Sequence, residues 1–222
     1  MELDSHQAGL AGPLRMSGFT TAISGLIAPA AGRLVQVREC DAAESLDLLV
    51  AGEVELASVE PIEGGPPPDD ARFEQSPVLE EPLVLLVPAD HPLASAESVA
   101  LADAAAEDWI VADAGTAATP SECVCFVRRP ASPRIAHAAT QWPAVWSLVG
   151  NGPGVSLVPR LAEGPAGEAV VRVPVSSEHM PMRILTCVRR GSSRNPLVAL
   201  GLQVLDEVAR AHQAAPIRLT AS

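Results

Sequence analysis

The amino-acid sequence predicts an α/β protein made of two lobes that are joined by two crossovers of the chain. Residues 83–87 are an unbroken apolar run between Pro82 and Pro88, which is typical of a strand buried on both faces of a parallel sheet. Further on, a helical pattern stops at residues 150–152 (GNG), and an apolar run follows at residues 155–158. The two segments indicate one sheet-and-helix unit in each half of the chain.

The first half alternates strands and helices. Asp41 is the predicted cap of a helix, with Glu44 completing a capping box and Gly52 ending the helix. We expect the buried stripe of this helix to hold Leu46, Leu49 and Val50. An earlier helix opens at Thr20 or Thr21. The strands are expected at residues 14–17, 34–39 and 55–59, and an irregular Pro/Gly-rich loop at residues 62–70.

The second half repeats the alternation and then returns. Strands are expected at residues 109–112, 134–137 and 155–158, and helices at 100–107, from 119 onward, and at 140–149. Residues 182–188 bring the chain back, and Asn195 caps a terminal helix whose predicted buried face is Leu197, Leu200, Val204 and Val208. The predicted organisation is a tail at 1–12, lobe I at 13–88 with 183–222, and lobe II at 89–182.

Composition restricts the partners. The 15 basic residues are all arginines against 27 acidic residues, so the net charge of −12 opposes binding to the phosphates of DNA. The first twelve residues lack the apolar core of a secretory signal, and no run approaches the roughly 18 apolar residues of a membrane span. The four cysteines form no CxxC pair or disulfide framework. We therefore expect a cytoplasmic protein with no nucleic-acid partner through this chain alone and no membrane partner.

No catalytic or metal site is visible in the sequence. Without lysine there is no Schiff-base, phosphate-loop or Ser-Lys chemistry. Cys123 and Cys125 fall in a predicted helix, where residues two apart point in different directions and do not chelate one ion. The five histidines show no metal-ligand or catalytic spacing. We expect no cofactor and no enzyme.

Six segments in order resemble the effector-binding domain of LysR-type transcriptional regulators of bacteria. The main three read EEPLVLLVPADHPLA at 80–94, LADAAAEDWIV at 101–111 and LVGNGPGVSLVPRLA at 148–162. Weaker matches are PLRMSGFTTA at 13–22, SLDLLVAGEVELASV at 45–59 and MRILTCVRRG at 182–191. The resemblance implies two Rossmann-like lobes with a two-crossover hinge, the type II periplasmic-binding-protein fold, and a sensor of a small molecule for a transcriptional regulator.

The sequence also departs from that family. About a dozen residues precede the first strand, where the family has a winged helix-turn-helix and a linker helix, so we expect no operator binding by the family's means. An enzyme or a solute-binding protein on the same fold is the alternative, because fold does not fix function. A third class is an interaction partner that binds no ligand and titrates a full-length homologue.

The candidate ligand-binding residues are those that this fold places at the carboxyl ends of strands and at helix starts. Hydroxyls and free backbone N–H groups at these places suit a small, anionic organic effector, and Phe19 and Trp142 are placed to flank an apolar body. Helix capping is the alternative role for Asp41 and the threonines. The candidates are Ser17, Phe19, Thr20, Thr21, Asp41, Ser58, Glu60, Thr116, Thr140, Gln141 and Trp142.

The expected assembly is a weak homodimer or a monomer. The family pairs its first helix with the helix at residues 140–149 of a partner, but here residues 30–33 pass directly into the second strand. The first helix is thus shortened by about two turns. The apolar residues left for a contact are Ala22, Ile23, Leu26, Ile27 and Ala30.

Overall fold

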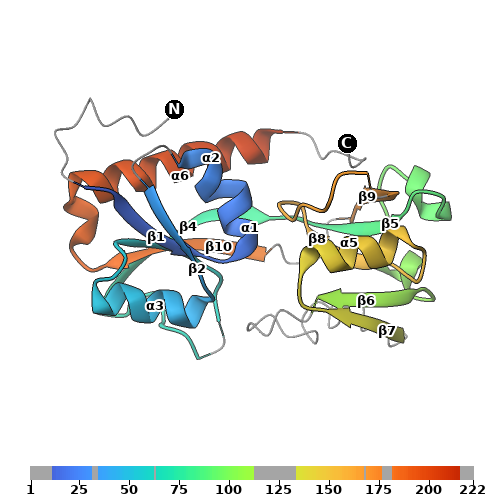
Figure 1. The fold of residues 1–222 in the computed structure, drawn as a ribbon, viewed down its shortest axis with the longest axis horizontal. Helices are drawn as coiled ribbons and strands as arrows, with labels where there is room; N and C mark the ends of the chain where they lie inside the picture. Colours follow the sequence, from blue (N-terminus) through green and yellow to red (C-terminus); the bar gives the residue numbers. More distant parts are fainter. Residues whose placement is uncertain are drawn as a thin grey trace. The chain divides into compact units, whose positions relative to one another are not determined.

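The computed structural model describes residues 12–31, 35–62, 64–112, 134–167, 169–176 and 182–215. The chain forms two compact units, the first from residues up to Glu81 with Met182–Ala215, and the second from Pro82–Pro181. Each unit has its own sheets and helices (Figure 1). The boundary expected after residue 88 lies instead at Glu81, because strand β5 (Leu83–Pro88) pairs with strands of the second unit.

The first unit is built on a five-stranded sheet of order β2-β1-β3-β10-β4. β1 is parallel to β2 and β3, whereas β10 is antiparallel to β3 and β4. The expected strands are present, and β4 is an additional strand that we did not predict. Its Pro77 breaks a strand pattern, but a proline is tolerated because β4 is an edge strand. The strands are β1 (Leu14–Gly18), β2 (Val35–Glu39), β3 (Leu56–Val59), β4 (Phe73–Glu81) and β10 (Met182–Arg189).

Two of the helices of the first unit carry the predicted caps. The Asp41 carboxylate accepts the Glu44 N–H at 2.8 Å, and Gly52 ends α3 at a φ of 74°. The Asn195 side chain accepts the Leu197 N–H at 2.9 Å at the start of α6. A third helical segment runs without a break from Thr20 to Ala30. The helices are α1 (Thr20–Ala22), the π-helical η2 (Ile23–Ile27), α2 (Ala28–Ala30), α3 (Ala42–Ala51), the 3₁₀ turn η5 (Ser192–Arg194) and α6 (Pro196–Ala214).

The predicted buried faces of α3 and α6 were partly wrong. In α3, Val50 is 56% exposed, and the buried residues are Ala42, Ser45, Leu48 and Leu49. In α6, the face is rotated by one residue and consists of Val198, Gly201, Val204, Leu205 and Ala209. Gly201 explains the rotation: a Cβ there would lie 2.5 Å from the Leu14 side chain, so the helix packs closely on β1 at this point.

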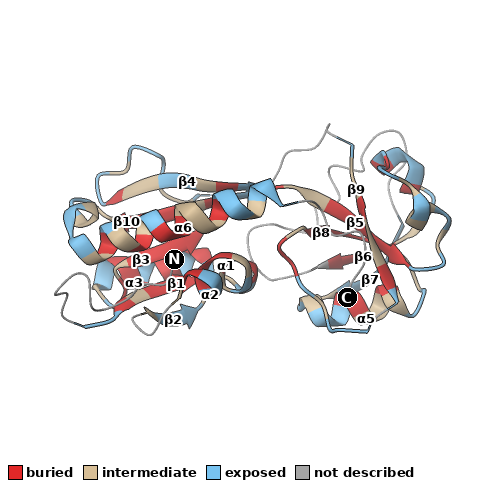
Figure 2. Ribbon diagram, turned by 90° about the horizontal axis from the view of Figure 1, so that it is seen from above, coloured by how far each residue is buried: buried red, intermediate tan, exposed pale blue. Residues whose placement is uncertain are grey.

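The second unit contains a three-stranded sheet, β8-β5-β9, and a two-stranded sheet, β6-β7. The expectation that β5 lies in a parallel sheet was wrong, because β5 is antiparallel to both neighbours. Its burial on both faces is confirmed (Figure 2): Leu85 and Val87 belong to one apolar cluster, Val84 and Leu86 to another. An apolar run in the sequence thus predicts that a strand is buried, but it does not predict whether the neighbouring strands are parallel or antiparallel. The strands are β5, β6 (Asp108–Ala112), β7 (Arg134–Ala139), β8 (Ser156–Pro159) and β9 (Val170–Pro174).

The helical elements of the second unit are shorter than expected. The segment predicted at 100–107 is a 3₁₀ turn, and the helix start predicted at residue 119 lies outside the described residues. The elements are η3 (Pro92–Ser95), η4 (Leu101–Ala104) and α5 (Trp142–Gly150). Within the described part of the chain, no helix has both the length and the apolar character required to cross a membrane.

Candidate functional site

The start of α1 differs from the starts of α3 and α6 because no side chain caps it. Phe19 occupies the N-cap position in an extended conformation and provides no cap, and the first turn contains no acidic residue. The first N–H groups of a helix lack internal partners, and the helix dipole places partial positive charge there. The segment from Thr20 to Ala30 therefore begins with backbone donors that suit an anion.

Two buried hydroxyls lie at the ends of the strands next to this helix start. Ser17 is 0% and Ser58 is 1% exposed, and Ser58 pairs with Gly18 across the parallel strands β1 and β3. Within the described residues, the Ser58 hydroxyl has no hydrogen-bond partner, and the Ser17 hydroxyl makes no hydrogen bond of normal geometry but contacts the Cys40 thiol. A buried hydroxyl without a partner costs about 1–3 kcal/mol, so Ser58 favours a role in binding over a role in stability. Ser17 pairs with Ala57 and therefore points to the opposite face of the sheet from Ser58, one residue before the end of β1.

The other candidates of the first unit are used in different ways. The Thr20 hydroxyl is exposed and donates to the Glu39 carboxylate of β2, while Thr21 is buried. Asp41 serves as the cap of α3, the alternative role considered from the sequence. Phe19 is half-buried, and Glu60 is half-buried beside a pocket on the α3 side of the sheet.

The candidates of the second unit lie at the start of α5. Gln141 is the N-cap residue, its side chain provides no cap, and the first turn contains no acidic residue. Thr140 and Gln141 are exposed. Trp142 is half-buried and packs edge-on against Trp146, with ring centroids 6.4 Å apart. Thr116 lies outside the described residues.

The structure describes two cysteines of the first unit, Cys40 and Cys187, and burial is the main cause of the raised pKa of each thiol. Burial raises the pKa of the Cys40 thiol, more than its contacts with the Ser45 and Ser17 hydroxyls lower it; Ser45 Oγ lies 3.2 Å from the sulfur. Burial, with a smaller effect of the Asp70 carboxylate, raises the pKa of Cys187 to about 12. Neither thiol is poised as a nucleophile.

We expect Cys187 to resist alkylation by iodoacetamide at pH 8 in the folded protein. A thiol with a pKa of about 12 has roughly one thiolate in ten thousand at that pH, and the side chain is fully buried. Peptide mapping by mass spectrometry measures the modification, and the urea-unfolded protein is the control in which Cys187 should react. Equal rates for Cys187 in the two states would contradict this assignment.

The described residues contain no group of three histidine, cysteine or acidic side chains placed to hold a metal ion. The uncapped helix start and the buried hydroxyls offer hydrogen-bond donors that could hold an oxyanion, and the Glu39 carboxylate, which accepts from Thr20, is a charged side chain beside them. The uncapped start of α1 was not singled out from the sequence. The signal was present: residue 19 is not Ser, Thr, Asp or Asn, and residues 20–22 (TTA) lack an acid.

Comparison with known proteins identifies the family. The profile of the LysR substrate binding domain matches residues 7–210, so the chain belongs to this family. It is an effector-binding domain of the LysR type with the two-lobed α/β fold of such domains.

Two curated relatives are transcriptional regulators. The chain is 29% identical over 158 residues to the RuBisCO operon transcriptional regulator of Allochromatium vinosum, with 70% of this chain and 52% of the relative covered. It is 28% identical over 123 residues to the Hca operon transcriptional activator HcaR of Escherichia coli (strain K12), with 54% of this chain and 41% of the relative covered. The chain spans about half the length of these relatives.

Solved structures show the same fold. HinK, a LysR family transcriptional regulator from Pseudomonas aeruginosa, superposes with a TM-score of 0.74 at 21% identity, covering 92% of this chain and 73% of that one. The effector binding domain of a BenM variant superposes with a TM-score of 0.71 at 16% identity, covering 92% and 97%.

Proposed function

We propose that this chain senses a small organic anion, in the cytoplasm, for a LysR-type transcriptional regulator. The acid group of the effector binds at the start of α1, where it accepts hydrogen bonds from the first-turn N–H groups and from the Ser17 and Ser58 hydroxyls. The observation that carries the proposal is the coincidence of an uncapped helix start with two buried hydroxyls, of which Ser58 has no partner among the described residues and Ser17 contacts the Cys40 thiol. The helix start and the two serine hydroxyls are all satisfied by the same kind of ligand group, one that accepts hydrogen bonds and carries negative charge.

The candidates with other roles rank lower in this proposal. Asp41 already caps α3. The Thr20 hydroxyl donates to Glu39, and this hydrogen bond must break before the hydroxyl can donate to a ligand. Thr140, Gln141 and Trp142 stay predictions for the second unit, as does Thr116. We propose no catalytic activity and no binding to DNA by this chain alone.

Replacing Ser17 with alanine is expected to weaken effector binding without loss of stability. The substitution removes a buried hydroxyl whose contact among the described residues is the Cys40 thiol, a weak hydrogen-bonding group, so stability should change little, while binding should weaken by about 1–3 kcal/mol. Calorimetry with a panel of small carboxylic acids measures the affinity, and urea unfolding measures the stability.

The matched control is Ser156→Ala in the second unit. Ser156 is also fully buried, but its hydroxyl donates to the Ile110 carbonyl at 2.8 Å. This variant should lose stability and keep its affinity for the effector. If Ser17→Ala behaves like Ser156→Ala, the Ser17 hydroxyl is a structural group and not a ligand contact.

We further propose a weak dimer or a monomer in solution. Most of the apolar residues that the first helix offers for a family-type contact are used inside the unit: Ala22, Leu26 and Ile27 are 0% exposed and Ala30 is 5% exposed. A stable dimer commonly buries about 1,200–2,000 Å² in total. Light scattering across a concentration series is expected to show the monomer at low protein concentration. A dimer that persists at nanomolar protein would place the contact on other surfaces.

A further inference from the structure

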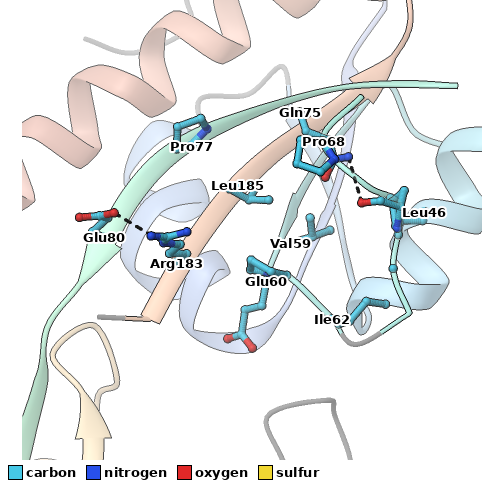
Figure 3. A pocket seen from close by; sticks show the side chains of 13 residues that line it. Leu46, Val59, Glu60, Ile62, Pro68, Gln75, Pro77, Glu80, Arg183 and Leu185 are labelled. Carbon is cyan, nitrogen blue, oxygen red and sulfur yellow. Dashed lines mark hydrogen bonds and ion pairs between the residues drawn. The ribbon is translucent and has the colours of Figure 1, made fainter. Parts of the chain in front are cut away.

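The first unit contains a pocket on the α3 side of its sheet, which we call the β4–β10 pocket (Figure 3). Its volume is about 510 Å³, within the range on the order of 300–1,000 Å³ in which proteins bind small molecules. All of its lining residues belong to the first unit: Leu46, Val59, Glu60, Pro61, Ile62, Gly65, Pro66, Pro68, Gln75, Pro77, Glu80, Arg183 and Leu185.

An irregularity in β4 directs the lining side chains to this face. Pro77 pairs with Leu185 and Glu80 pairs with Arg183, but Leu79 pairs with Ile184, so Val78 has no partner in the register. Such a bulge re-aims the side chains that follow it. As a result, Pro77 and Glu80 both line the pocket although they are three residues apart in the strand. Leu79, which lies between them, is buried and does not line the pocket.

The pocket has an apolar wall and a tethered edge. Leu46, Ile62 and Leu185 are partly buried and pack against the apolar cluster between α3 and the sheet. The loop that closes one side is tied to β4, because the Gln75 amide donates to the carbonyls of Pro66 and Pro67 at 3.3 and 2.9 Å. A preformed apolar cavity of this kind binds an apolar body without first having to be ordered.

The charged end of the pocket is formed by Arg183 and Glu80. Arg183 Nε lies 3.6 Å from a Glu80 carboxylate oxygen, and both side chains are more than half exposed, so the pair itself contributes little stability. Within the described residues, the two terminal nitrogens of Arg183 make no hydrogen bond. In Figure 3 Arg183 and Glu80 lie together at one end, while the Glu60 carboxylate is directed away from the other lining side chains.

We propose that the β4–β10 pocket is a second binding site, and that it takes a small organic acid with one carboxylate and an apolar body. The planar guanidinium fork of Arg183 matches a carboxylate in geometry as well as in charge. The Glu80 carboxylate beside Arg183 favours a ligand with a single negative charge, because a dianion would meet this like charge. The apolar body contacts Leu46, Ile62 and Leu185.

The proposed site lies next to the two connections between the units, where a bound ligand could regulate the protein. β4 ends at Glu81 and β10 begins at Met182, which are the points where the chain leaves the first unit and returns to it. Arg183 and Glu80 are each one residue from such a point. A ligand held by this pair contacts both connecting strands.

The test uses three probes of the same shape: cyclohexanecarboxylate, cyclohexanecarboxamide and cyclohexylmethylamine. Saturation-transfer NMR and calorimetry measure their binding to the wild-type chain, Arg183→Gln and Glu80→Gln. Both substitutions fall on exposed side chains, so both variants should fold. We expect the acid to bind better than the amide and the amine, Arg183→Gln to weaken the acid about tenfold or more, and Glu80→Gln to strengthen it.

Changes in binding opposite to those expected would overturn the proposal. Binding of the amine that strengthens in Arg183→Gln and weakens in Glu80→Gln would make this a cation site. Equal binding of acid and amide, unchanged in Arg183→Gln, would make it an apolar pocket without charge recognition. Absence of binding by all three probes would also overturn it.

Two further variants separate this site from the proposed effector site. Leu46→Trp fills the β4–β10 pocket and should abolish binding of the acid there, whereas Phe19→Asp, at the start of α1, should leave it unchanged. Acid binding that survives Leu46→Trp and disappears in Phe19→Asp would support the effector site and refute the second site. The reverse result would support the second site alone.

Discussion

Replacing Phe19 with aspartate is expected to abolish effector binding while stabilising the helix that it precedes. Phe19 already has the extended backbone of an N-cap residue, with φ −84° and ψ 163°. An aspartate there accepts an N–H of the first turn and provides negative charge, which stabilises a helix by about 0.5–2 kcal/mol relative to alanine. The same carboxylate occupies the donors that we assign to the effector. Its affinity should therefore fall by about two orders of magnitude or more.

Three substitutions of Phe19 separate the effects of the aromatic ring, of a helix cap and of negative charge. Phe19→Ala removes the aromatic ring alone, Phe19→Asn adds a neutral cap, and Phe19→Asp adds a charged cap. The expected order of affinity is wild type, Ala, Asn, Asp, whereas Asn and Asp should both be more stable than Ala. Calorimetry and urea unfolding measure the two properties. Equal affinities for the alanine and aspartate variants would mean that the ring contacts the ligand and the helix start does not.

Replacing Trp146 with alanine is expected to cause the largest loss of stability, about 3–5 kcal/mol in the second unit. Trp146 is 0% exposed and lies in the apolar cluster around β5 and α5. The Arg172 guanidinium stacks over its ring at 5.3 Å and donates to the Ala162 carbonyl at 2.8 Å. Truncation leaves a cavity of side-chain size and removes this stacking partner.

Trp142 provides the matched control for this prediction. It lies one helical turn earlier in α5, contacts Trp146 edge-on and is half-buried, so Trp142→Ala should cost less. Gly164→Ala probes the same core from the other side, because a Cβ at Gly164 would lie 2.0 Å from the Trp146 ring. Urea unfolding followed by circular dichroism measures all three. A loss below about 1 kcal/mol in Trp146→Ala would mean that this core readily repacks.

Local signals predicted those parts of the fold that depend on local chemistry. The cap Asp41, the terminating Gly52 and the cap Asn195 each act through their own helix, and each was found where the sequence indicated. Strand direction is different, because it depends on partners far along the chain. The apolar run of β5 was recognised, but not its antiparallel neighbours, and β9 was not predicted at all.

The same division applies to the candidate site. Residue types indicated Ser17 and Ser58, because hydroxyls at strand ends are a local pattern in this fold. The sequence did not indicate that Thr20 donates to Glu39, since the two residues lie on different elements. The β4–β10 pocket depends on the register at Val78, and register depends on pairing between strands distant in sequence.

The most direct test of the proposed function is a calorimetric titration of two proteins, Leu46→Trp alone and Leu46→Trp with Phe19→Asp, in both of which the tryptophan closes the β4–β10 pocket. The ligand is the small carboxylic acid that most raises the melting temperature of the Leu46→Trp protein, with its amide as the neutral comparison. We expect binding of one acid per chain to the protein with Phe19, weaker binding of the amide, and no measurable binding in Phe19→Asp. Equal affinity of the acid for both proteins would contradict the assignment of an anionic effector to the start of α1.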